Sequence, residues 1–219
     1  MSSSYTLHTP AGSFRAFKIL IAAEYNGIDI DIPEFDINAA TQLSPTGKAP
    51  VLETPSNNNG NGPVLFESNA IARYIATLRN DTALTGNGFV EAALVDQWCD
   101  FCAHQLELPA CVWFYPVAGY MPFQKAAYDK AKGDFSAALS VLNTALEGKT
   151  YLVNDDKITL ADITVASALV YPFKLVCDGK YLKKYKNVTR WFKDCVSQDE
   201  FKSVIGEVTM CKKELKAAQ

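Results

Sequence analysis

The chain has 219 residues, which is enough for one large domain or two small ones with a buried core. Hydrophobic residues make up 48% and charged residues 21%, as in an ordinary soluble globular protein, and the net charge of −3 gives no electrostatic support for nucleic-acid binding. No apolar run approaches the roughly 20 residues that a membrane span needs, and the N-terminus lacks the pattern of a signal peptide.

The first eighty residues alternate between strand and helix patterns. A strand is predicted over residues 5–8, and an amphipathic helix follows from residue 14 to Asn26-Gly27, a pair typical of a helix end. A second strand over 29–32 is closed by Pro33. A strand–helix–strand unit predicts that the two strands are parallel and joined by a right-handed crossover.

Two further strands are predicted over residues 51–53 and 64–66, with turn-forming residues 56–62 as a long flexible hairpin tip between them. A helix over about 68–78 completes a β-α-β-β-α domain of the thioredoxin-like kind. We place this domain at residues 1–80.

Beyond a linker at about 80–88 the pattern is helical. One long helix should run from about residue 89 toward 117 with a kink at Pro109, because proline cannot supply the interior N–H bond. Later helices are predicted over 161–175, 188–196 and 201–211. Another helix carries an apolar stripe at i, i+4, i+7 and i+11, formed by Phe135, Leu139, Leu142 and Leu146. These helices form the second predicted domain, at residues 88–219.

Two short motifs flank the third and fourth strands. Gly47-Lys48-Ala49-Pro50 turns into the third strand and suits a cis bond between Ala49 and Pro50. Glu67-Ser68 follows the fourth strand and opens a helix, whose N-terminal N–H groups and dipole make a good seat for a carboxylate. The simpler alternative is that Glu67 and Ser68 only cap their helix.

A third motif has a structural interpretation. Thr159 is placed to cap the helix over 161–175, and Asp162 stands three residues later, as in a capping box. Ile158 and Ile163 lie at the two ends of a hydrophobic staple. We expect Thr159 and Asp162 to act in folding and not in catalysis.

With these motifs the chain resembles the soluble glutathione S-transferases. The resemblance implies an α/β plus all-α fold, in which a thioredoxin-like N-terminal domain precedes a helical C-terminal domain. It also implies a glutathione pocket, in which the backbone before the cis-proline pairs with the cysteinyl part and the acid–serine pair holds the γ-glutamyl end. The residues that match this pocket are Lys48, Ala49, Pro50, Glu67 and Ser68.

The chain differs from the glutathione S-transferase pattern at the position of the residue that activates the glutathione thiol. A thiol of pKa near 8.5 must become a thiolate, and active family members use a tyrosine, serine or cysteine at the end of the first strand. Counting back from Arg15, which resembles the arginine of serine-type members, the serine slot falls at Ala11 and the tyrosine slot near Thr9. Only Ser13 or Thr9 could substitute, so they are weak catalytic candidates.

Other chemistry-bearing residues favour plain structural roles. Cys99 and Cys102 form a single CxxC pair followed by His104, and without a second ligand pair we favour core packing over zinc or a redox role. His8 has no visible acidic partner and is interpreted as a strand residue. The six cysteines are spread through predicted helices, which favours reduced thiols and a cytoplasmic protein. The lysines near residues 183–186 and 212–216 are interpreted as solvated faces.

Within the transferase fold, the chain most resembles the N-terminal transferase-like domain of the gamma-subunit family of translation elongation factor 1. The stretches that carry this resemblance are residues 14–23, 65–74, 160–164 and 190–212. The sequence differs from the family pattern at residues 57–62. The Lys/Ala-rich end at 212–219 resembles the start of the lysine-rich linker that leads to a second domain in this family.

That family implies a non-catalytic or weakly catalytic scaffold, which binds and anchors the guanine-nucleotide exchange subunit during translational elongation. It leaves a homodimer open and implies no direct contact of this domain with nucleic acid or membrane. The alternative function is a glutathione S-transferase that conjugates glutathione to electrophiles. Neither function needs a metal or a bound cofactor. Glutathione is the one ligand that the sequence allows as a possible binder.

Overall fold

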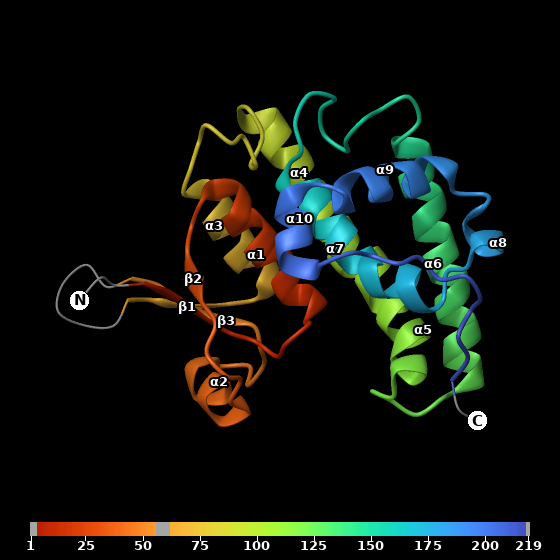
Figure 1. The fold of residues 1–219 in the computed structure, drawn as a ribbon, viewed down its shortest axis with the longest axis horizontal. Coiled ribbons are helices and arrows are strands. Elements are labelled where there is room, and N and C mark those ends of the chain that lie inside the picture. The colour runs from red at the N-terminus through yellow and green to blue at the C-terminus, as the bar shows by residue number, and fades with distance from the viewer. Residues whose placement is uncertain (1–3, 56–61, 218–219) are drawn as a thin grey trace. The chain divides into compact units, whose positions relative to one another are not determined.

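The computed structural model describes residues 4–55 and 62–217, and the chain divides into two compact units between Thr85 and Gly86 (Figure 1). The first unit holds a four-stranded sheet with helices, and the second is helical, so the predicted fold class is confirmed. None of the helices in the described ranges is both long and apolar enough to cross a membrane.

The sheet of the first unit has the order β2-β1-β3-β4, in which β1 and β2 are parallel and the other pairs are antiparallel. The parallel pair confirms the predicted strand–helix–strand unit. The strands are β1 (Tyr5–His8), β2 (Ile30–Asp31), β3 (Val51–Glu53) and β4 (Val64–Phe66). The helices are α1 (Phe14–Asn26), α2 (Ile37–Leu43) and α3 (Ser68–Thr77).

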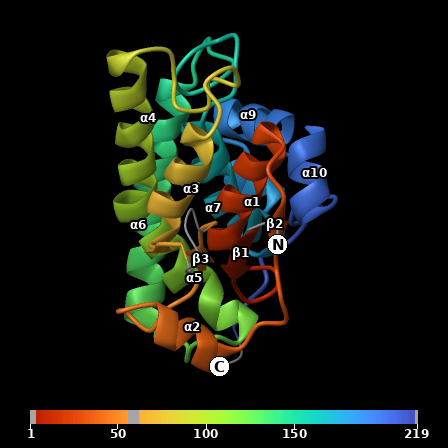
Figure 2. The ribbon, with the colours of Figure 1, turned by 90° about the vertical axis from the view of Figure 1, so that its left-hand side faces the viewer.

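Helices α1 and α3 lie side by side, and their contact carries much of the core of this unit (Figures 1 and 2). Ile19 and Ile21 of α1 and Ile71 and Ile75 of α3 are completely buried. Helix α1 ends as its sequence predicts: Gly27 has φ 61°, a left-handed conformation that favours glycine, and its N–H bonds to the carbonyl of Glu24.

Helix α2 was not among the predicted elements. Only Ala40 of its seven residues is buried, and Ile37 is exposed, so no apolar stripe marks it in the sequence. Its beginning is instead fixed locally, because the Asp36 side chain accepts a hydrogen bond from the Asn38 backbone at 2.8 Å. The predicted hairpin tip falls mostly on residues 56–61, which lie outside the described residues.

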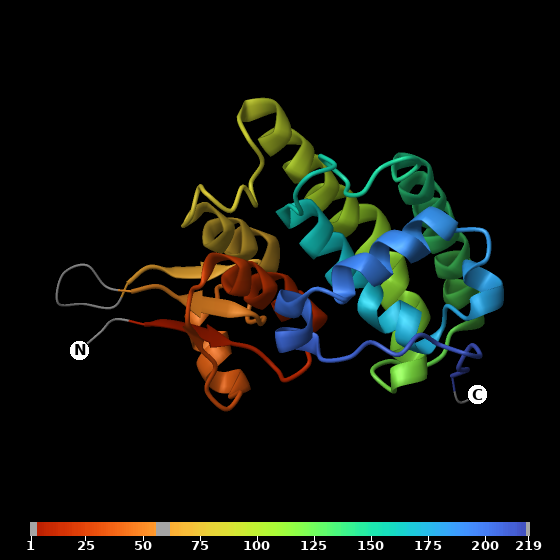
Figure 3. The ribbon, with the colours of Figure 1, turned by 45° about the horizontal axis from the view of Figure 1, so that its top comes forward.

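In the second unit, α7 packs against α4, α5 and α9 (Figure 3). Thirteen of its sixteen residues are buried, so α7 forms the centre of this unit. The unit contains α4 (Phe89–Phe101), a π-helical segment η1 (Cys102–Glu107), α5 (Leu108–Ala118), α6 (Lys125–Ala145), α7 (Leu160–Leu175), α8 (Gly179–Leu182), α9 (Lys186–Val196) and α10 (Asp199–Ile205).

Two predicted helices differ from the structure. The long helix continues to Ala118, but its irregularity is the wide turn of η1, which ends just before Pro109. Pro109 thereby stands in the first turn of α5, where its missing N–H is tolerated. The prediction of a helix over 201–211 is wrong beyond Ile205, because Gly206 has φ 67° and ends α10.

The residues after Gly206 are held by hydrogen bonds to the end of α7. The Cys211 N–H donates to the Phe173 carbonyl at 2.7 Å, and the Leu215 N–H donates to the Leu175 carbonyl at 2.9 Å. Backbone hydrogen bonds to α7 therefore hold this tail segment in place of helical hydrogen bonds.

The predicted capping box at the beginning of α7 is present. Both the backbone N–H and the hydroxyl of Thr159 donate to Asp162 Oδ2 at 3.0 Å. The other carboxylate oxygen, Oδ1, accepts from the Leu152 N–H and from Trp191 Nε1, each at 2.9 Å. Burial raises the pKa of Asp162 above its ordinary value, and these hydrogen bonds act in the opposite direction because they stabilise the charged form.

We predict that Thr159→Ala lowers the free energy of unfolding by about 1–2 kcal/mol, because it removes a buried helix cap. Urea unfolding followed by circular dichroism measures the loss. The matched control is Thr77→Ala, which removes an exposed hydroxyl near the end of α3 and should change stability by less than about 0.5 kcal/mol. Equal stabilities of the two variants would show that the cap is not a significant source of stability.

A larger loss is expected for Asp162→Asn. Each carboxylate oxygen accepts two donors, and an amide has only one oxygen, so two donors would face an NH₂ group. At about 1–3 kcal/mol for each unsatisfied buried donor, the free energy of unfolding should fall by about 2–6 kcal/mol. The control is Asp134→Asn on the exposed face of α6, which should be nearly neutral. A wild-type midpoint for Asp162→Asn would contradict the assignment.

Candidate functional site

The register of the sheet brings three predicted site segments to one edge. His8 pairs with Val51, and Val51 pairs with Phe66, so the end of β1, the start of β3 and the end of β4 coincide. The next residues along each strand are Thr9, Pro50 and Glu67. Thr9 is therefore a neighbour of residues more than forty positions later in the sequence, at what we call the β1/β3/β4 edge.

The peptide bond between Ala49 and Pro50 is cis, as predicted. Pro50 is buried, Ala49 is half-buried and Lys48 is exposed. Exposure to solvent thus decreases along this turn from Lys48 to Pro50.

Glu67 has a backbone conformation that is rare for a residue with a side chain. Its φ is 69° and its ψ is 111°, and it is exposed and immediately precedes α3. Such a conformation costs of order 1–3 kcal/mol and is concentrated at ligand sites. Glu67 is the N-cap residue of α3, and its carbonyl accepts from the Ile71 N–H, but its side chain makes no capping hydrogen bond. Ser68 is the first residue of the helix and is half-buried.

Lys18 is a buried charged residue near the beginning of α3 that sequence analysis did not single out. It lies on α1, only 1% of its surface is exposed, and its Nζ donates to Asn69 Oδ1 at 2.8 Å. Asn69 is the second residue of α3, so the Lys18 ammonium lies close to the N-terminus of that helix. A positive side chain and a helix N-terminus together favour an anion at this place. The sequence signal was a lysine at an otherwise apolar position of a buried helix face.

Of the two weak catalytic candidates, Thr9 follows β1 at this edge and Ser13 lies four residues further along the chain. Thr9 is 5% exposed, and its hydroxyl donates to the neighbouring Pro10 carbonyl at 3.4 Å. Ser13 is the N-cap residue of α1, and its carbonyl accepts from Ala16 and Phe17. Ala11, at the position of the expected serine, is exposed and has no hydroxyl.

His8 has an acidic partner, contrary to the sequence interpretation. Its Nε2 lies 2.7 Å from Glu53 Oε1, across the β1–β3 pair. The two residues are 45 positions apart, so only the strand register brings them together. The pair is a cross-strand contact of the sheet, of a kind that stabilises neighbouring strands.

Cys99 and Cys102 pack in the core of the second unit. Both are buried, and their sulfurs point toward α7: Cys99 Sγ lies 3.6 Å from Thr164 Oγ1, and Cys102 Sγ lies 3.8 Å from the Thr164 carbonyl. Burial raises the pKa of two other thiols, Cys177 and Cys195, well above the ordinary value. These thiols stay protonated at neutral pH and are poor nucleophiles.

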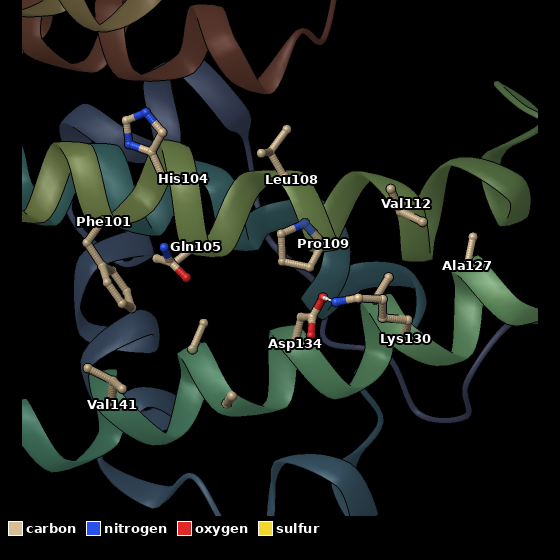
Figure 4. A pocket seen from close by; sticks show the side chains of 13 residues that line it. Phe101, His104, Gln105, Leu108, Pro109, Val112, Ala127, Lys130, Asp134 and Val141 are labelled. Carbon is tan, nitrogen blue, oxygen red and sulfur yellow. Dashed lines mark hydrogen bonds and ion pairs between the residues drawn. The ribbon is translucent and has the colours of Figure 1, made fainter.

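A groove of about 540 Å³ runs between the η1–α5 segment and α6 (Figure 4). Phe101 and Gln105 point into it from one side, and the Lys130–Asp134 pair lies on the other. Two apolar side chains among its lining residues, Leu108 and Val141, are more than half exposed. The groove is largely apolar and brings no nucleophile together with a base, so it suits contact with another molecule better than catalysis.

Comparisons with known proteins agree with this architecture. Family models for the N-terminal and C-terminal domains of glutathione S-transferase match residues 3–77 and 108–199. The chain belongs to the glutathione S-transferase family.

Within this family the chain is similar to elongation factor 1-gamma. It is 40% identical to elongation factor 1-gamma-B of Xenopus laevis over 218 residues, which cover 95% of this chain and 48% of that protein. The predicted resemblance is confirmed at this level. The chain spans about half the length of the curated relatives it matches.

Solved structures share the fold. The GST-like domain of elongation factor 1-gamma from Saccharomyces cerevisiae has a TM-score of 0.83 at 21% identity and covers all of both chains. A glutathione transferase from Phanerochaete chrysosporium, solved in complex with oxidized glutathione, has a TM-score of 0.80 at 22% identity. It covers 92% of this chain and 94% of that chain.

Proposed function

We propose that the chain is a scaffold domain of a translation elongation factor 1 complex, which binds and anchors the guanine-nucleotide exchange subunit during elongation. The observation that carries this proposal is the 40% identity to elongation factor 1-gamma over 95% of the chain. Its contacts are with protein, and neither nucleic acid nor a membrane is a direct partner of this domain.

The β1/β3/β4 edge supports a non-catalytic role. Activation of a thiol needs a hydroxyl or a base that points to the sulfur. Here Ala11 has no hydroxyl, and the Thr9 hydroxyl is buried against the Pro10 carbonyl. Ser13 is the one remaining hydroxyl among the candidates, and it stands at the first turn of α1.

The same edge keeps the features that suit a glutathione ligand. We propose that the backbone at Ala49 and Pro50, the exposed Lys48, and the Glu67-Ser68 pair at the beginning of α3 would hold it. The buried Lys18 ammonium adds positive charge near a carboxylate seated at that helix N-terminus. Glutathione transferase activity is the second candidate function, and this arrangement of binding residues is the observation that favours it.

Turnover separates the two functions. With glutathione and a generic electrophile, we expect a rate close to the uncatalysed one, because Ala11 has no hydroxyl and the Thr9 hydroxyl is bound to the Pro10 carbonyl. Absorbance of the conjugate measures the rate, with Ser13→Ala and Thr9→Val as matched variants that should change nothing. Robust turnover that disappears in Ser13→Ala would make the chain an enzyme and Ser13 its catalytic residue.

The scaffold role is tested by co-elution with the exchange subunit from the same organism. We expect a stable complex without nucleotide or nucleic acid, and one that persists at about 0.3 M salt, since stable obligate interfaces are relatively apolar. Size-exclusion chromatography with light scattering measures complex formation. The measured mass distinguishes a complex with one copy of this chain from a complex that contains a homodimer of it. Failure to bind at any salt concentration would contradict the scaffold role. Complete loss by about 0.3 M salt would show a charge-driven contact instead.

A further inference from the structure

A basic pocket of about 590 Å³ lies in the second unit, where α6, α8 and the tail segment after Gly206 meet. We call it the lysine pocket. Four lysines and two acidic residues line it, so its charge is positive in a chain whose net charge is −3. The lining residues are Lys132, Asp178, Lys180, Tyr181, Lys183, Lys184 and Glu214.

Both carboxylates of the pocket are already bound by the protein's own donors. Glu214 Oε1 lies 2.6 Å from Lys132 Nζ and accepts from the Tyr128 hydroxyl at 3.2 Å. The Asp178 side chain accepts from the Tyr181 N–H at 2.8 Å, and this hydrogen bond holds the pKa of Asp178 below its ordinary value. Glu214 is therefore paired with Lys132, while Asp178 keeps its negative charge and interacts electrostatically with Lys180. Lys180, Lys183 and Lys184 together still carry more charge than this one carboxylate, so the pocket stays positive.

Three lysines stay available to an outside anion. Within the described part of the chain, no carboxylate oxygen lies within 4.0 Å of the ammonium groups of Lys180, Lys183 or Lys184. The Lys184 ammonium is nevertheless held in place: it donates to Ser136 Oγ at 3.1 Å and lies 4.9 Å from the centre of the Tyr185 ring. A cation fixed in this way loses less conformational freedom when it binds an anion.

We infer that the lysine pocket binds an acidic polypeptide segment, whose aspartate or glutamate carboxylates pair with Lys180, Lys183 and Lys184. A peptide fits better than a nucleic acid because its charges stand on separate, flexible side chains. Its carboxylates can pair with individual lysines while the rest of the segment turns away from Asp178 and Glu214. The phosphates of a duplex are fixed about every 1.7 Å along its axis and cannot avoid these two acids in the same way. This inference does not depend on the proposed function.

Fluorescence anisotropy of labelled octaglutamate, added to the full chain at about 50 mM salt, tests the inference. We expect saturable binding that weakens steeply as salt increases. The triple variant Lys180→Gln, Lys183→Gln, Lys184→Gln should bind about tenfold more weakly, the loss expected for three exposed ion pairs of about 0.5 kcal/mol each.

The matched control is Lys125→Gln, Lys130→Gln, Lys149→Gln, which removes the same charge from exposed lysines outside the pocket. Its affinity should stay within about twofold of wild type. An equal loss in both triple variants would overturn the inference, because it would show general attraction and no site. Absence of octaglutamate binding would also overturn it. If a single-stranded RNA of equal charge bound the pocket more tightly than octaglutamate, and lost affinity in the pocket variant, the ligand would be nucleic acid and the inference would be overturned.

Discussion

Four hydrogen bonds converge on the buried carboxylate of Asp162, and the helical unit is organised around them. Leu152 in the loop before α7 donates one of them, Thr159 at the N-cap of α7 donates two, and Trp191 of α9 donates the fourth. A fully buried carboxylate without such partners would be very costly, so its presence requires all of these segments to be in place together.

The position of this carboxylate also explains why a polar group is used in an apolar core. Helix α7 is buried on nearly every side, and a helix that is apolar all round has no stripe to fix its rotation. Hydrophobic burial would therefore stabilise several rotations of α7 about equally. The directional hydrogen bonds of Asp162 favour one, because only one rotation brings both oxygens to their donors.

The predictability of each element follows from the kind of signal that forms it. Helix α3 has an amphipathic stripe and matches its predicted range closely, and the predicted stripe of Phe135, Leu139 and Leu142 lies on the buried side of α6. Helices α2 and α8 have one buried residue each and leave no stripe. A helix was predicted over 201–211, but α10 ends at Ile205, and the following segment instead makes hydrogen bonds to the end of α7. The prediction placed the irregularity of the long helix at Pro109, but the π-helical turn η1 lies before it, at Cys102–Glu107.

The same distinction applies to the candidate site. The positions of Thr9, Pro50 and Glu67 follow from strand ends, which short motifs mark in the sequence, so their meeting at one edge was predictable from the fold. Lys18 and Asn69 are 51 residues apart, and neither residue alone indicates a contact with the other. Their hydrogen bond exists because α1 and α3 pack together, so tertiary structure supplies it.

At the β1/β3/β4 edge, the features that would bind a ligand are different from the feature that would activate it. The groups proposed to hold a peptide-like anion at the β1/β3/β4 edge stand at positions fixed by the strand register, the cis bond before β3 and the beginning of α3. Thiol activation instead requires one side-chain group at one position, and Ala11, at the expected serine position, has no hydroxyl. A member of this fold can therefore lose catalysis through one substitution while its binding edge and its helical unit stay intact.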